Sequence, residues 1–334
     1  MIFIQKFINR YFFTPNVFDK FISFLLLPIS FIYYLIAILR KKYGVKQNFD
    51  VKIISIGNLV SGGSGKTPFC IALLEFLHSI DYTCLAVILR GYKRDTKGFL
   101  QVSRNGEILC NVADSGDEAM LIAIRTSTLK TSIFVDESRI EAISRAKEQG
   151  IKIILLDDSY RFTFEKFDIL LEPEILPYYD RVLPSGYYRF PPSFYANCDM
   201  HLKEGIDYKR KTSLCISGFI AREFEYTKDS TNYTESKSNR YILATAIANP
   251  VRLDPFLESL QPHMIVYKYY LPDHDIFDEN KLRCLLEIYN AQYILMTQKD
   301  FVKCQNFSLP IHIIDLHIDI AKDRLDKILE YLKD

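Results

Sequence analysis

The feature that most constrains this chain is a glycine-rich segment, SIGNLVSGGSGKTPF, at residues 55–69. It overlaps the end of a short apolar run at residues 51–57 that is typical of a strand, and a helix is expected from Thr67 to about His78. Strand, glycine-rich loop and helix in this order are typical of a phosphate-binding loop, because glycine permits the dihedral angles that turn backbone N–H groups toward phosphate oxygens. An ordinary glycine-rich turn is the alternative, and the Gly-Lys-Thr sequence at its end favours nucleotide binding.

The loop departs from the standard spacing G-x-x-x-x-G-K-[ST], since Val60 stands where the first glycine is expected. We expect the adjacent Gly62 and Gly63 to supply the missing flexibility. Lys66 would then contact the terminal phosphates of a nucleotide, and the hydroxyl of Thr67 would be a ligand of Mg²⁺. The candidate nucleotide-binding residues are Val60, Ser61, Gly62, Gly63, Ser64, Gly65, Lys66 and Thr67.

Two carboxylates follow another apolar run, KIILLDD, at residues 152–158. The carboxyl ends of parallel strands are where α/β sheets bind ligands, so Asp157 is predicted to be a second Mg²⁺ ligand and Asp158 a catalytic residue. A helix cap or a loop turn is the alternative for this pair. Together with the loop, the pair predicts that the chain uses Mg²⁺ and ATP.

Strands and helices alternate along the rest of the chain, which predicts an α/β fold with a parallel sheet covered on both faces. We expect two α/β/α domains, the first like a P-loop NTPase and the second smaller and Rossmann-like. The predicted divisions are residues 1–45, a membrane-associated helical segment; 46–214, the P-loop kinase domain; 215–239, a polar connector resembling a β-hairpin; and 240–334, the second α/β domain. Further strands are expected within 84–92, 131–137, 167–173, 240–247, 264–270, 293–298 and 311–316, and further helices within 139–150, 252–260, 278–289 and 321–333.

The N-terminal segment has a different character. The run from Phe21 to Leu39 carries no charge and is about the length needed to cross a bilayer as a helix. A basic cluster at residues 40–42 follows and suits an anionic, cytoplasmic lipid surface. Residues 1–13 are expected to be an interfacial amphipathic piece. A buried core helix is the alternative interpretation of the apolar run.

Composition restricts the partners. The net charge of +1 gives no general attraction to nucleic acid, and no nucleic-acid partner is expected. The seven cysteines are scattered without a C-x-x-C pair, which argues against a disulfide framework and a structural zinc site and suits a reducing compartment.

Eight segments in order resemble the lipid A 4′-kinases, or tetraacyldisaccharide 4′-kinases, of Gram-negative bacteria. They are SIGNLVSGGSGKTPF, VILRGYKR, DSGDEAMLIA, LLDDSYRF, RVLPSGYYRFP, TAIANP, LPDHDIF and LMTQKDFVKC. The resemblance covers nearly the whole chain. It implies transfer of the γ-phosphate of ATP to the 4′-hydroxyl of a tetraacylated glucosamine disaccharide 1-phosphate. The acceptor would be a membrane-embedded acylated lipid, and the reaction would take place at the cytoplasmic face of the bacterial inner membrane.

The resemblance also implies roles for particular residues. Asp117 and His274, from different domains, would act together as the base that activates the acceptor hydroxyl. Lys66 is a catalytic candidate as well as a nucleotide ligand, and Arg189 would pair with a phosphate of substrate or ATP. The side chains of Lys299 and Asp300 are expected to steady the interface between the domains.

Two positions depart from the family pattern. Phe162 stands where the family has histidine, and Phe190 stands where it usually has glutamate, so those contacts are not expected here. Arg161 is expected to supply a positive charge in place of the missing histidine.

Two other classes of protein remain open at this point. One is a membrane-associated P-loop switch ATPase, in which a lysine reaches across a dimer; that position is Ser61 here, so the lysine is absent. The other is a small-molecule kinase whose apolar N-terminus packs internally.

Overall fold

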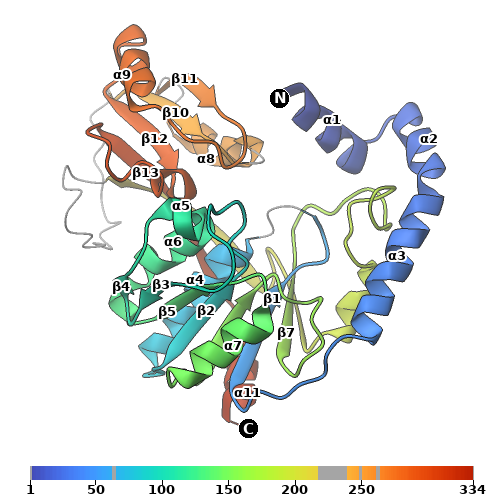
Figure 1. The fold of residues 1–334 in the computed structure, drawn as a ribbon. Coiled ribbons are helices and arrows are strands. Elements are labelled where there is room, and N and C mark those ends of the chain that lie inside the picture. Colours follow the sequence, from blue (N-terminus) through green and yellow to red (C-terminus); the bar gives the residue numbers. More distant parts are fainter. Residues whose placement is uncertain (1, 62–64, 217–238, 248–249, 261–263, 334) are drawn as a thin grey trace.

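The computed structural model describes residues 2–61, 65–216, 239–247, 250–260 and 264–333. Two β-sheets with their helices form two units, and three further helices precede them in the chain (Figure 1). The predicted α/β class is confirmed, and the structure has two sheets.

The first sheet places the phosphate-loop strand near its centre. β1 (Lys52–Gly57) lies between β6 (Ile153–Asp157) and β7 (Phe167–Glu172), and all three are parallel. The parallel part is completed by β2 (Leu85–Leu89), β5 (Ser132–Val135) and β8 (Met200–Lys203).

One edge of this sheet is antiparallel, so the sheet is mixed rather than wholly parallel as predicted. The edge consists of β3 (Leu100–Arg104), which runs against β5, and β4 (Glu107–Ile108), which runs against β3. The turn between them is Asn105-Gly106, and both residues have positive φ, +50° and +89°. Asn-Gly with this backbone geometry favours a tight hairpin, which adds the two extra strands.

Helices cover both faces of the first sheet, as predicted. α4 (Lys66–Ser79) and α6 (Asp117–Arg125) pack against the face that includes Ile54 and Ile56. α7 (Arg139–Glu148) packs against the opposite face, which includes Ile53. Because successive side chains of a strand point to opposite faces, the continuous apolar run of β1 fills both layers.

The second sheet has the order β11-β10-β12-β13-β9. The four predicted strands are confirmed as β10 (Tyr241–Thr245), β11 (Ile265–Tyr270), β12 (Tyr293–Thr297) and β13 (Ile311–Ile320). The predicted helices are present as α8 (Asp254–Ser259), which follows the short turn Pro250–Leu253, and α9 (Glu279–Ile288); α10 (Gln298–Phe301) is additional.

The fifth strand of this sheet crosses the expected domain limit at residue 214. β9 (Tyr208–Ile216) pairs with β13 over its whole nine-residue length, in antiparallel register. Its first residues therefore belong to the second sheet, and Cys215 and Ile216 continue the strand instead of opening a connector. The expected hairpin at the remaining connector residues lies outside the described part of the chain.

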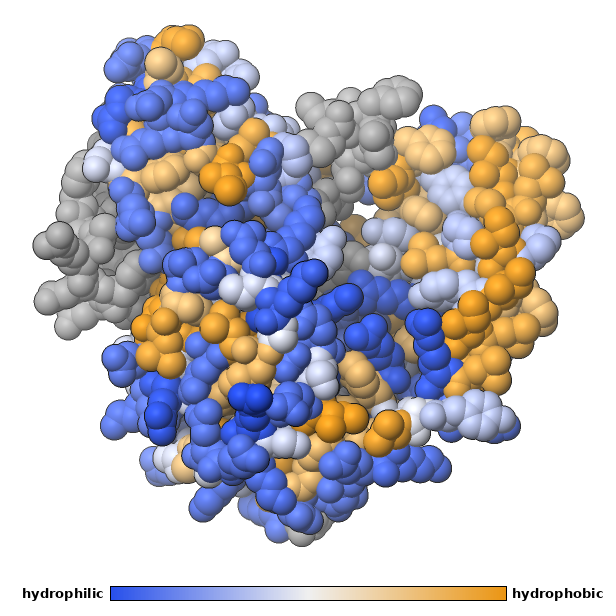
Figure 2. Space-filling model, in the orientation of Figure 1, coloured by the Kyte–Doolittle hydropathy of each residue, from blue (hydrophilic) through white to orange (hydrophobic). Residues whose placement is uncertain are grey.

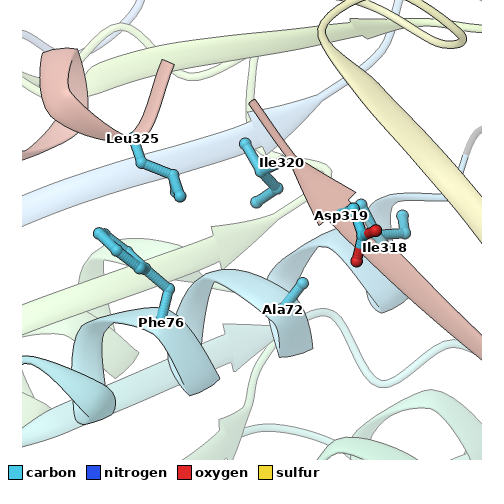
Figure 3. A pocket seen from close by; sticks show the side chains of 6 residues that line it. All are labelled: Ala72, Phe76, Ile318, Asp319, Ile320 and Leu325. Atoms are coloured by element: carbon cyan, nitrogen blue, oxygen red, sulfur yellow. The ribbon is translucent and has the colours of Figure 1, made fainter. Parts of the chain in front are cut away.

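The last helix also differs from the expected division. α11 (Lys322–Lys333) follows β13 but packs on the first unit, beside β1 (Figure 1). The Tyr331 ring stacks on Phe167 at 4.8 Å, and the Tyr331 hydroxyl donates a hydrogen bond to the Ile53 carbonyl at 3.1 Å. Between α4, the end of β13 and α11 lies a cavity of about 410 Å³ (Figure 3). It is lined by Ala72, Phe76, Ile318, Asp319, Ile320 and Leu325.

The N-terminal segment consists of three helices rather than one. α1 (Ile2–Phe13) is followed by α2 (Val17–Leu25) and α3 (Leu27–Lys42), and the last two meet at 53°. Pro28, at the start of α3, has no N–H to continue the hydrogen bonding of α2, so the chain bends there. Within the described residues no single helix is long and apolar enough to span a membrane, although the bent pair meets that test by length and composition.

The polarity of α2 and α3 is inverted relative to an ordinary surface helix. Their buried side chains are polar: Asp19, Ser23 and Ser30. Ser23 Oγ donates to the Ser185 carbonyl at 2.7 Å, and Ser30 Oγ accepts from the Ser185 N–H at 2.8 Å. A buried core helix would show the opposite pattern, so that alternative is wrong.

The outward side of the two helices is apolar, and this apolar face runs along one flank of the molecule (Figure 2). It consists of Val17, Phe18, Phe21, Phe24, Leu25, Ile29, Phe31, Ile32, Leu35, Ile36 and Leu39, each 41–86% exposed. A contiguous apolar surface of this kind marks a contact with a partner or a membrane.

Candidate active site

Val60 in the phosphate-binding loop is explained by a short antiparallel bridge. Val60 pairs with Tyr188, the Ser61 N–H donates to the Tyr187 carbonyl at 2.9 Å, and the Arg189 N–H donates to the Leu59 carbonyl at 2.6 Å. The Val60 side chain is only 4% exposed. An extended, buried position suits a β-branched residue, so valine stabilises the start of the loop where glycine would add freedom.

The second half of the loop leads directly into α4. Gly65 is the N-cap of α4 with φ +82°, and a Cβ there would lie 3.1 Å from the Arg210 guanidinium. Only glycine fits this position without strain. Thr67 lies in the first turn of α4, and Gly62, Gly63 and Ser64 lie outside the described residues.

Lys66 is held at the carboxyl edge of the sheet by two groups. Its Nζ donates to Asn58 Oδ1 at 3.2 Å and lies 3.8 Å from Asp158 Oδ1. Asn58 is itself fixed by donating to the Val60 carbonyl at 2.6 Å. Asn58 was not predicted from the sequence, although a polar residue directly after an apolar strand was the available signal.

Asp157 ends β6 beside β1, where its backbone pairs with Ile56. The side chain is almost fully buried, and Oδ1 has no hydrogen-bond partner among the described residues. Burial raises the pKa of this carboxyl to about 7, against the opposing charge of Lys66.

The donor set at this edge fits a magnesium ion. An unpaired carboxylate oxygen on Asp157 and a hydroxyl on Thr67 are hard oxygen ligands of the kind that Mg²⁺ prefers. No cluster of three or more His, Cys, Asp or Glu side chains suited to a metal occurs in the described residues. Mg²⁺ is usually held by one or two carboxylates together with substrate phosphates, and Asp157 supplies one such carboxylate.

Asp158 differs from its neighbour because two cations flank it. Arg189 Nη1 donates to Asp158 Oδ2 at 2.6 Å, and Lys66 lies on the other oxygen. Burial opposes the charged form, but the charges of Lys66 and Arg189 outweigh it and lower the pKa of Asp158. Lys66, Asp158 and Arg189 were all predicted from the sequence as catalytic candidates. The structure brings them together, with the two cations on either side of the Asp158 carboxylate.

An aromatic cluster connects this group to α3. Lys41 Nζ lies 3.2 Å from the centroid of the Tyr160 ring, with Phe194 at 5.5 Å and Phe190 at 5.9 Å. Burial lowers the pKa of Lys41 to about 8. Phe190, in place of the family's glutamate, thus forms part of a cation–π site, and Lys41 faces the protein instead of joining a lipid-facing basic cluster.

The other departure from the family pattern, Phe162 in place of histidine, takes part in packing in this chain. The Phe162 ring stacks on Phe164 at 5.8 Å, and the Arg161 guanidinium lies 4.8 Å from the Phe162 ring. Phenylalanine at this position fills apolar space against the sheet rather than presenting a hydrogen-bonding ring.

Asp117 and His274 meet across the two units. His274 Nδ1 lies 3.0 Å from Asp117 Oδ2, and both side chains are about nine-tenths buried. Asp117 is the first residue of α6, after Gly116 with φ +84°, and His274 has φ +68° in the turn after β11. The positive φ of His274 is uncommon for a non-glycine residue and is held by its N–H bond to the Ala246 carbonyl at 3.0 Å.

Two lysines complete this pair. Lys299 Nζ lies 3.1 Å from His274 Nε2, and Lys303 Nζ lies 3.6 Å from Asp117 Oδ2. Burial alone would raise the pKa of Asp117, but the hydrogen bond from His274 and the charge of Lys303 lower it. Lys303 was missed from sequence, since nothing in the segment LMTQKDFVKC distinguishes a site lysine from a solvated one.

Lys299 and Asp300, which were expected to steady the interface, have different roles. Lys299 does reach the first unit, 3.9 Å from Glu118. Asp300 is fully buried inside the second unit, where it accepts bonds from Thr245 Oγ1 at 2.6 Å and the Ala246 N–H at 3.0 Å. It therefore joins β10 to α10 and does not reach the interface.

A glycine-rich loop with a lysine after a central strand, and a carboxylate–imidazole pair presented from two sides, define a P-loop phosphotransferase class of site. The family model for tetraacyldisaccharide-1-P 4′-kinase matches residues 22–333. The chain belongs to this family and is a kinase.

Relatives and a solved structure agree with that assignment. The tetraacyldisaccharide 4′-kinase of Aliarcobacter butzleri is 43% identical over 96% of this chain and 94% of its own. That of Helicobacter acinonychis is 39% identical over 98% and 95%. The crystal structure of LpxK from Aquifex aeolicus in complex with ATP has a TM-score of 0.72, covering 93% of this chain and 99% of that one at 23% identity, and it supports the fold.

Replacing each of the adjacent aspartates by asparagine should change stability in opposite directions. The raised pKa of Asp157 means that its ionisation disfavours the native state increasingly as pH rises from about 4 to about 7. In the metal- and nucleotide-free protein, Asp157→Asn should therefore raise the free energy of unfolding, and by more at pH 8 than at pH 5.

The lowered pKa of Asp158 means that its charge stabilises the native state above its unfolded pKa and ceases to do so only in acid. Asp158→Asn should lower the free energy of unfolding about equally at pH 5 and pH 8. Urea denaturation of both variants at the two pH values measures this contrast, and the same sign for both variants would contradict it.

Proposed function

We propose that this chain transfers the γ-phosphoryl group of ATP to the 4′-hydroxyl of a tetraacylated glucosamine disaccharide 1-phosphate. The observation that carries the proposal is the hydrogen-bonded pair Asp117–His274, contributed by the two units. Membership of the tetraacyldisaccharide-1-P 4′-kinase family supports the identity of the acceptor. An alcohol is a poor nucleophile at neutral pH, so a carboxylate held by an imidazole is the group that such a reaction needs.

The donor side uses the carboxyl edge of the first sheet. The N–H groups at the start of α4 and the ammonium of Lys66 bind the terminal phosphates. Thr67 and Asp157 would hold Mg²⁺, which when bound would neutralise charge on the phosphates. Arg189 is held beside Asp158, 2.6 Å away, and is positioned to bind phosphate charge from the opposite side of Lys66.

On the acceptor side, Asp117 takes the proton of the 4′-hydroxyl as the new O–P bond forms. Its lowered pKa keeps it a carboxylate at neutral pH, so it is ready to accept a hydrogen bond from the alcohol. His274 orients the carboxylate through Oδ2, where Lys303 Nζ also lies, so Oδ1 is the oxygen proposed to meet the acceptor. Since the two residues lie on different units, the base is complete only when the units are together.

The apolar face of α2 and α3 is proposed to lie on the cytoplasmic face of the inner membrane. A lipid with several acyl chains stays in the bilayer, so the kinase has to work at that surface. The exposed phenylalanine, leucine and isoleucine side chains supply apolar area, and Arg40 and Lys42 near the end of α3 supply charge for anionic headgroups. The exposure of this face also argues against a small-molecule kinase with an internally packed N-terminus.

Activity should depend on Lys66. With Mg²⁺, ATP and the disaccharide 1-phosphate in detergent micelles, the native protein should add one phosphate at the 4′ position, detected by mass spectrometry of the lipid. Lys66→Met should lower kcat by more than about 100-fold, because the variant lacks the positive charge that stabilises the terminal phosphates during transfer. The control is Lys147→Met, which removes an exposed lysine of α7 that pairs with Asp50. This variant should retain activity. ATP hydrolysis without a phosphorylated lipid would contradict the proposed function.

Membrane binding should depend on the apolar face. A triple serine variant at three of its residues should fail to float with vesicles of phosphatidylethanolamine and phosphatidylglycerol, whereas the native protein should float. The three residues are Phe21, Phe24 and Leu35. A matched triple serine variant of exposed apolar residues elsewhere should float normally, at Leu109, Ile206 and Ile288. Equal flotation of the native protein and both variants would exclude the apolar face as the membrane contact.

A further inference from the structure

The imidazole of His274 is occupied at both nitrogens. Nδ1 faces Asp117 Oδ2 at 3.0 Å. Nε2 faces Lys299 Nζ at 3.1 Å, and the Asp273 carboxylate lies beyond hydrogen-bond distance of Nε2, with Oδ2 at 3.6 Å. The Tyr92 ring stands edge-on to the imidazole, with the ring centroids 5.4 Å apart. These contacts leave His274 no ring nitrogen directed at an acceptor molecule.

The partner at Nε2 decides the position of the imidazole proton. A lysine ammonium has three donors and no acceptor, so Nε2 has to accept. Asp117, with its lowered pKa, is an acceptor-only carboxylate, so Nδ1 has to donate. Both requirements are met only by the neutral imidazole with its proton on Nδ1.

We propose that Lys299 is a positioning residue that fixes His274 as the neutral Nδ1–H tautomer, so that Asp117 accepts the proton of the substrate alcohol. The proposal rests on the proposed kinase function. It assigns Lys299 a role distinct from phosphate binding, because the ammonium acts through His274 and does not contact the reacting atoms.

The surroundings of Lys299 keep its charge in place. Its Nζ lies 3.6 Å from Asp273 Oδ1 and 3.9 Å from Glu118 Oε1, one carboxylate on each unit. Lys93 donates to the Asp273 carbonyl at 3.0 Å and holds that loop from the first unit. The ammonium is therefore balanced by carboxylates from both sides of the interface while it donates to the imidazole.

Lys303 supplies a matched comparison. It follows Lys299 by four positions and lies 3.6 Å from Asp117 Oδ2 and 3.7 Å from Asp300 Oδ1. It is a second cation at the same pair, but it acts on the carboxylate and not on the imidazole. Replacing either lysine by methionine removes one positive charge, but only the replacement of Lys299 also removes the donor to Nε2.

The test is the tautomer of His274, measured by nitrogen NMR of protein labelled with ¹⁵N in the imidazole rings. The chain has only six histidines, and the spectrum of His274→Gln identifies the signals of His274. The native protein, Lys299→Arg and Lys303→Met should show His274 with its proton on Nδ1. Lys299→Met should show a mixture of tautomers or an imidazolium.

Kinetics supply the functional half of the test. Lys299→Met should lower kcat by about 10- to 100-fold with little change in KM for ATP, and Lys299→Arg should recover most of the loss. An Nε2–H tautomer or an imidazolium for His274 in the native protein at neutral pH would overturn the proposal, and so would an unchanged tautomer in Lys299→Met. Because the tautomer is read without turnover, a protein with the Nδ1–H tautomer but without lipid kinase activity would contradict the proposed function alone.

Discussion

The hydrogen bond between Asp117 and His274 is the interaction on which the site depends, because it joins side chains that are 157 residues apart and lie in different units. Each side needs an unusual backbone: a glycine with positive φ before Asp117, and a left-handed conformation at His274 itself. The ribbon of β9 and β13 and the return of α11 to the first unit keep the two units close enough for the bond to form. In the proposed function, the donor phosphates are bound by one unit, while the base for the acceptor is assembled by both.

The N-terminal helices extend this arrangement toward the proposed membrane surface. Their serines bind the turn at Ser185, and their apolar side chains face outward. Lys41 packs on the Tyr160 ring, two residues after Asp158, and near Phe190, the residue after Arg189. The segment that is proposed to lie on the bilayer is therefore packed against the loops that carry Asp158 and Arg189.

Much of this architecture was predictable from sequence, because local patterns specify it. The run at residues 51–57, the glycine-rich loop and the helix after it gave β1 and α4 within a residue or two, and four strands of the second sheet followed from apolar runs. Long-range pairing was not predictable. The polar sequence of β9 gives no sign that it pairs with β13, and α11 has the amphipathic pattern of any surface helix, which does not say which unit it covers. Lys299 and Lys303 were not predicted as partners of His274 and Asp117 for the same reason, because only the folded chain brings these lysines close to those side chains.

The most direct measurement of the central claim is a double-mutant cycle on kcat with Asp117→Ala, His274→Ala and the combination of both. If the two side chains act as one base, each single variant should lose most of the activity, and kcat of the double variant should be little lower than that of the less active single variant. If the two losses instead multiply, Asp117 and His274 act independently, and the account of a base shared between the units is wrong.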